Sequence, residues 1–74
     1  MSKHSIELFN ETYKLVMELS EVYLLEWIEI AEVMDCNVDT LRALRNSTPE
    51  KIKVSDQTMN KAIPKLKDFI KQFE

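Results

Sequence analysis

The chain has 74 residues, of which 31% are charged, and its formal net charge is −3. A chain of this length forms one domain, residues 1–74, with a modest core and no room for a deep substrate cleft. The single cysteine excludes an intramolecular disulfide and favours a cytoplasmic location. The most apolar segment, residues 22–34, carries three glutamates, so we expect no membrane span and no membrane partner.

The charge is distributed unevenly along the chain. Residues 1–40 hold two lysines and nine acidic residues, a net charge of −7, whereas residues 41–74 hold eight basic and four acidic residues, a net charge of +4. This polarity indicates an oriented partner, with ordinary surface charge sorted by chance as the other interpretation.

The apolar residues between Ile6 and Tyr23 recur at three- and four-residue steps, which is the period of a helix. We predict a first helix over residues 5–19, with Ser5 as its N-cap. Ser20 is the best candidate for an interruption and for the cap of a second helix that ends near Met34. No glycine or proline enforces a break there.

The turn that follows Met34 has to form without glycine, since the chain contains none. Asp35 or Asn37 is therefore expected to adopt a positive φ or a turn conformation, which Asp and Asn tolerate best among the other residues. Asn37 is also a good N-cap for a third helix over residues 38–45, which would bury Leu41 and Leu44.

The last third of the chain begins with a loop at residues 46–50 and an extended connection at residues 51–54. Ser55 or Asp56 then caps a final helical region. Pro64 lies inside that region and predicts either a kink or a division into two helices. The predicted fold class is all-α, a small domain of four to five helices.

Residues 27–46 carry a pattern of small and apolar positions around the predicted turn. The positions are Ala31, Met34, Cys36, Leu41 and Leu44. This spacing resembles the core of the lambda-repressor-like (Cro/XRE-type) helix-turn-helix family. Two positions depart from the family pattern. Asp35 replaces the usual turn glycine, and Trp27 stands where the family has a polar residue that contacts phosphate, so we expect a core role for Trp27.

The resemblance implies a small sequence-specific DNA-binding transcriptional regulator of phage or mobile-element type, with the helix of residues 37–45 in the major groove of double-stranded DNA. The positions that match base-reading residues are Val38, Asp39, Arg42 and Ala43. The positions expected to contact or attract phosphates are Arg45, Asn46, Thr48, Lys51 and Lys53. Such a regulator is expected to be a homodimer. Phe69, Ile70 and Phe73 are equally suited to a dimer contact and to the core of the single chain.

An acidic face is the basis of an alternative function. It consists of Glu7, Glu11, Glu18, Glu29 and Glu32. These carboxylates share one narrow face if the first two helices are continuous or nearly aligned. Such a face is either simply solvated or a docking surface for the basic, nucleic-acid-binding surface of a partner protein.

Enzymatic function is not expected. His4 lies in a terminal segment, and the position of Cys36 in the pattern is a core position, where a thiol is inert. One cysteine and one histidine do not provide a zinc site of ordinary ligand count, and a chain without glycine has no glycine-rich phosphate loop. We therefore expect no cofactor and no metal.

Overall fold

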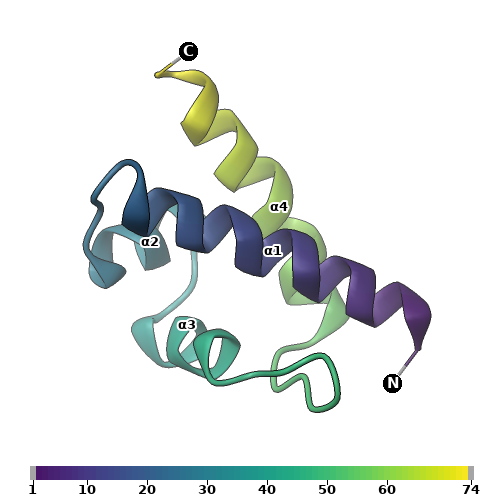
Figure 1. Ribbon diagram of the computed structural model, residues 1–74. Helices are drawn as coiled ribbons and strands as arrows, with labels where there is room; N and C mark the ends of the chain where they lie inside the picture. The colour runs from purple at the N-terminus through teal and green to yellow at the C-terminus, as the bar shows by residue number, and fades with distance from the viewer. Residues whose placement is uncertain (1, 74) are drawn as a thin grey trace.

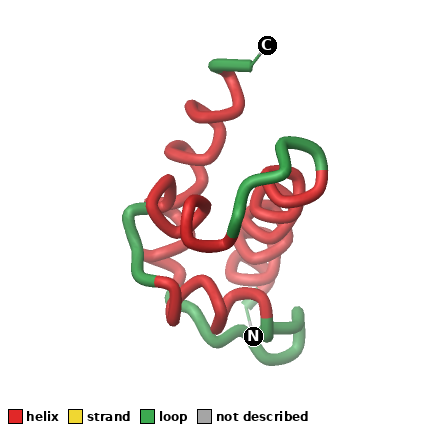
Figure 2. Tube along the Cα trace, turned by 90° about the vertical axis from the view of Figure 1, so that its left-hand side faces the viewer, coloured by secondary structure: helices red, strands yellow, loops and turns green. Residues whose placement is uncertain are grey.

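The computed structural model describes residues 2–73, which form four α-helices and no strand (Figure 1, Figure 2). Helix α1 spans Lys3–Glu21, α2 spans Trp27–Met34, α3 spans Val38–Arg45 and α4 spans Asp56–Lys71. The predicted all-α fold class is confirmed. The most extensive helix–helix packing joins α1 and α4, while α2 contacts both of them and also α3. None of these helices combines the length and the apolar character that crossing a bilayer requires.

Helix α1 begins earlier and ends later than the sequence predicted. Ser2, not Ser5, caps it, because the Ser2 hydroxyl accepts a hydrogen bond from the Ser5 backbone N–H at 3.1 Å. Ser5 lies in the first turn, where its hydroxyl donates to Asp56 Oδ2 at 2.9 Å. The predicted break at Ser20 is also wrong, since α1 continues to Glu21. A serine inside a helix costs only about 0.5 kcal/mol, which packing easily offsets.

The connection between α1 and α2, residues 22–26, contains the real break. Leu24 adopts a φ of 59°, a left-handed conformation that is unfavourable for a residue with a Cβ. Glu26 then caps α2, and the Glu29 carboxylate accepts a hydrogen bond from the Glu26 backbone N–H at 3.0 Å. This return bond is one half of a capping box. The second helix therefore begins at Trp27 and not after Ser20.

One core receives residues from all four helices. Its most deeply buried large apolar side chains are Val16, Leu19, Ile30, Leu41, Leu44, Met59 and Leu66. The predicted burial of the α3 leucines is confirmed, and Trp27 is half-buried against the core. Thr12 is fully buried too, and its hydroxyl donates to the Leu8 carbonyl oxygen at 2.7 Å, so this polar group is satisfied within its own helix.

Helix α4 begins after the cap residue Ser55 and continues through Pro64 as a single helix. The division into two helices at this proline does not occur. Proline has no N–H, so the Asn60 carbonyl loses its usual intrahelical bond. Asn60 and Pro64 are both exposed, so the missing bond lies on the exposed side of the helix. Ile63 and Leu66 are buried and keep this part of α4 packed on the core.

The C-terminal apolar residues differ in burial. Ile70 is buried and closes the core of the single chain, and Phe69 is half-buried against it. Phe73 remains 55% exposed. Its ring packs at an angle against the Tyr23 ring, at a centroid distance of 5.0 Å, and against the Phe69 ring, at 5.3 Å.

Candidate nucleic-acid interface

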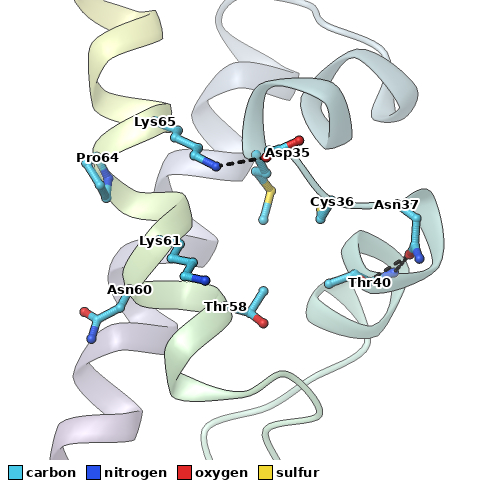
Figure 3. Close-up of a pocket in the computed structure, with 10 residues that line it drawn as sticks. Asp35, Cys36, Asn37, Thr40, Thr58, Asn60, Lys61, Pro64 and Lys65 are labelled. Atoms are coloured by element: carbon cyan, nitrogen blue, oxygen red, sulfur yellow. Dashed lines mark hydrogen bonds and ion pairs between the residues drawn. The ribbon is translucent and has the colours of Figure 1, made fainter.

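A short turn, residues 35–37, joins α2 to α3. Asp35 ends α2 with φ 57° and ψ 45°, which confirms the predicted positive φ. The Cys36 backbone N–H donates to the Ala31 carbonyl oxygen at 3.0 Å. Asn37 caps α3, because its side-chain oxygen accepts a hydrogen bond from the Thr40 backbone N–H at 2.8 Å (Figure 3). The turn thus closes without glycine, since aspartate tolerates the left-handed conformation and asparagine supplies the cap.

The outward side of α3 carries one pair of opposite charges. Asp39 and Arg42 are exposed, and their carboxylate and guanidinium lie 3.3 Å apart. The buried Leu41 and Leu44 fix which side of the helix faces outward. An exposed ion pair contributes at most about 1 kcal/mol, so both groups can exchange this contact for another partner at little cost.

The other two predicted base-reading residues are less exposed. Val38 is half-buried and packs against the edge of the core. Ala43 lines a shallow hollow together with Asp39 and Lys53. Its carbonyl oxygen accepts a hydrogen bond from the Ser47 hydroxyl at 2.8 Å. The structure therefore brings Ala43 and Asp39 together with Lys53, one of the residues predicted to contact phosphates. Val38 lies at the margin of this surface, against the core.

The segment after α3 is held in shape by Ser47. This buried side chain accepts a hydrogen bond from the Lys53 backbone N–H at 2.9 Å, in addition to donating to α3. Thr48 and Lys51 exchange backbone hydrogen bonds at 3.1 and 3.0 Å and form a tight turn. The lysine side chains of this segment are exposed. Sequence reasoning did not assign this role to Ser47, because composition carries no signal for it.

Arg45 and Asn46 lie at the C-terminal end of α3, and both are exposed. The Arg45 guanidinium carbon lies 3.7 Å from the centroid of the Trp27 ring. A cation over an indole at an exposed site contributes about 0.5–1 kcal/mol. This contact links the end of α3 to the start of α2 and holds the arginine close to the protein surface.

Positive and negative charges lie on different parts of the molecule. Residues 38–53 have a net charge of +2, which results from Arg42, Arg45, Lys51 and Lys53 against Asp39 and Glu50. Residues 18–35 hold six acidic residues and no lysine or arginine. Helix α3 and the turn after it lie at one end of the molecule, and the connection between α1 and α2 lies toward the other end with the C-terminus (Figure 1, Figure 2).

The alternative acidic face required the first two helices to be continuous or nearly aligned. This condition is not met, because α1 ends at Glu21 and the chain turns through residues 22–26 before α2 begins (Figure 1). Glu11 is paired with Lys67 on α4 at 2.7 Å. Glu29 and Glu32 lie on α2, apart from the three carboxylates of α1. The five carboxylates therefore do not share one helix face.

A hollow opens between the α2–α3 turn and α4 (Figure 3). Asp35 and Lys65 form an ion pair across it at 3.3 Å. Burial raises the pKa of the Cys36 thiol, the negative charge of Asp35 raises it further, and the positive charge of Lys65 opposes this shift. Cys36 is therefore a weak nucleophile. Within residues 2–73, no three side chains of the metal-binding types gather where they would hold an ion.

Comparison of the chain with protein-family models, with curated proteins and with solved structures found no match.

Proposed function

We propose that the chain is a small sequence-specific DNA-binding transcriptional regulator of the helix-turn-helix type, in which α3 enters the major groove of double-stranded DNA. The observation that carries this proposal is the orientation of α3. Leu41 and Leu44 anchor its inner side, so Asp39 and Arg42 are presented outward.

The chemistry of this pair suits recognition of base edges. The Arg42 guanidinium matches the two acceptors of a guanine, N7 and O6, and the Asp39 carboxylate matches the amino group of a cytosine. The exposed ion pair between them keeps the guanidinium on the outward side of α3. A good bidentate contact of this kind discriminates against a wrong base by about 1–3 kcal/mol. Val38 and Ala43 then contact thymine methyl groups at the edge of the same surface.

The segment after α3 supplies attraction to phosphates. Lys51 and Lys53 are exposed on a backbone that Ser47 and the Thr48 turn hold in place. Asn46 and Thr48 add neutral hydrogen-bonding groups. Glu18, Glu21, Glu26, Glu29 and Glu32 lie on α1, on the α1–α2 connection or on α2, whereas Asp35 lies in the turn directly before α3, where it is paired with Lys65. One α3 helix contacts too few base pairs for a long site, so we propose a homodimer that reads two half-sites about one DNA turn apart.

Selection from a random-sequence duplex pool at several salt concentrations tests this proposal. A dimer that neutralises six phosphates, through Arg45, Lys51 and Lys53 of each protomer, gives a log–log salt slope of roughly −5. A selected short palindrome with such a slope supports the proposal. Failure to bind any duplex at low salt rejects it.

Three single substitutions separate base reading from phosphate attraction. Arg42→Ala is expected to change the preferred sequence, whereas Lys51→Ala is expected to weaken binding to all sequences equally. Lys71→Ala is the matched control, because it removes one exposed positive charge at the far end of α4 (Figure 1). An unchanged sequence preference in Arg42→Ala would exclude Arg42 as a base-reading residue.

A further inference from the structure

A group of large apolar side chains remains exposed at the end of the molecule that carries the α1–α2 connection. Val22 is 66% exposed, Leu24 78% and Ile28 56%, and Phe73 from the end of α4 is also exposed. The ring of Tyr23, within the same connection, packs against the Phe73 ring at a centroid distance of 5.0 Å, so the two segments adjoin. We call these residues the apolar patch. Single exposed apolar residues are ordinary, but four of them on two adjoining segments indicate a site of association.

A hollow beside the apolar patch has an apolar floor and a charged rim. Leu25, Val33 and Phe69 form the floor, and Glu29 and Glu32 stand beside them. All three floor residues are half-buried, so this floor is open to solvent. The hollow adjoins the apolar patch, because the Phe69 ring contacts the Phe73 ring at 5.3 Å and Leu25 follows Leu24. A lysine or arginine fits such a site, since its methylene stem covers apolar surface while its charge reaches a carboxylate.

The charge around the apolar patch selects the class of partner. Four exposed carboxylates belong to the same segment: Glu21, Glu26, Glu29 and Glu32. The three ion pairs of the described residues involve none of them. Two copies of this surface would place like charges together, and an anionic membrane or nucleic acid would be repelled. A surface of this kind is complementary to apolar residues that are flanked by lysines or arginines.

We propose that the apolar patch and the adjoining hollow bind a basic amphipathic helix of a partner protein. Apolar residues of that helix would cover Leu24 and Ile28, and a lysine or arginine would enter the hollow between Glu29 and Glu32. This surface is separate from the outward side of α3, so the interaction does not depend on the proposed DNA binding. It also differs from the acidic face predicted from the sequence, because it is centred on the apolar residues of the α1–α2 connection.

The test uses the full chain and a synthetic helical peptide with leucines on one side and lysines on the other. Isothermal titration gives the affinity, and amide NMR shifts give the location. We expect saturable binding that shifts residues 21–33 and 69–73 and leaves α3 unchanged. A peptide of the same composition, reordered so that it is not amphipathic, is the ligand control and is expected to bind at least tenfold more weakly.

Two variants with matched charge separate a specific site from general attraction. Glu32→Lys and Glu7→Lys change the net charge equally, but Glu7 is an exposed residue in the first half of α1, away from the apolar patch. We expect at least a tenfold loss of peptide affinity in Glu32→Lys and less than a twofold change in Glu7→Lys. Leu24→Asn, which keeps a residue suited to the positive φ, is expected to lose affinity without losing the fold, as circular dichroism will show.

Three results would overturn the proposal. The first is the absence of saturable peptide binding at low salt. The second is an equal loss of affinity in both charge-reversal variants, because this would reduce the interaction to net charge. The third is self-association of the free protein through the apolar patch, detected by analytical ultracentrifugation and abolished by Leu24→Asn. DNA selection on the same variants keeps this outcome distinct from failure of the proposed DNA function.

Discussion

Replacing Leu24 by glycine tests whether the left-handed conformation in the α1–α2 connection carries a cost. Leu24 has a φ of 59°, yet it is 78% exposed, so it contributes little to the core. Val22, in the same connection, is 66% exposed and has a φ of −93°, a conformation that any residue adopts. Val22→Gly is therefore a matched control in which no backbone strain is relieved.

The expected free-energy changes follow from three contributions. Leu24→Gly relieves about 1–2 kcal/mol of left-handed strain. It costs about 0.5–1 kcal/mol for the greater freedom of glycine in the unfolded chain. It loses about 0.3–0.6 kcal/mol because about a fifth of the leucine side chain is buried. The net change in stability is close to zero. Val22→Gly has only the unfavourable contributions and is expected to lose about 1–2 kcal/mol.

Urea unfolding of both variants, followed by circular dichroism, measures the difference. We expect Leu24→Gly to be more stable than Val22→Gly by about 1.5 kcal/mol, which corresponds to roughly 6–12 °C in Tm for a domain of this size. Leu24→Val should be less stable than the unchanged chain, because a β-branched residue fits a positive φ poorly. If the two glycine variants lost the same stability within about 0.5 kcal/mol, the reasoning about strain at Leu24 would be refuted.

Three further predictions concern single side chains. Thr12→Val should leave the free energy of unfolding unchanged or raise it by up to about 1 kcal/mol, because the Thr12 hydroxyl bonds only within its own helix and its removal leaves no orphaned partner. A loss of more than about 1 kcal/mol in urea unfolding would contradict this expectation. Arg45→Ala should shift the emission of the single tryptophan, Trp27, to longer wavelength and cost about 0.5–1 kcal/mol, whereas Arg42→Ala should leave the emission unchanged. At a pH near the ordinary thiol pKa, Cys36 should react with a maleimide more slowly than free cysteine, because its raised pKa leaves less thiolate. Unfolding in urea should restore the rate, and a folded protein that reacts as fast as free cysteine would contradict the burial of the thiol.

The helices were predictable where local signals and packing agree. Helix α3 and its cap Asn37 were assigned correctly because the cap, the acidic first turn and the paired leucines all indicate the same boundary. The start of α2 was predicted wrongly. The chain has no glycine or proline near this point, and Leu24 is a residue that normally avoids a positive φ. The bond between the Glu26 backbone N–H and the Glu29 carboxylate is a feature that hydrophobic periodicity does not indicate.

The candidate site shows a similar limit. Periodicity was enough to place Arg42 on the outward side of α3, because the neighbouring leucines had to be buried. It did not reveal that Arg45 stacks on Trp27, since that contact joins residues from different helices. The acidic face depended on helices that proved to be separate, because a helical wheel drawn through an unrecognised turn assigns residues to a face that does not exist.

The packing of α1 against α4 has a consequence for folding during synthesis. The first and last helices of the chain share the most extensive contact, and α2 reaches α3 on one side and both of these helices on the other. A nascent chain that lacks α4 also lacks its buried residues Met59, Ala62, Ile63, Leu66 and Ile70, so the first three helices have no complete core. We therefore expect the nascent chain to remain protease-sensitive until α4 is outside the ribosome and can pack against α1.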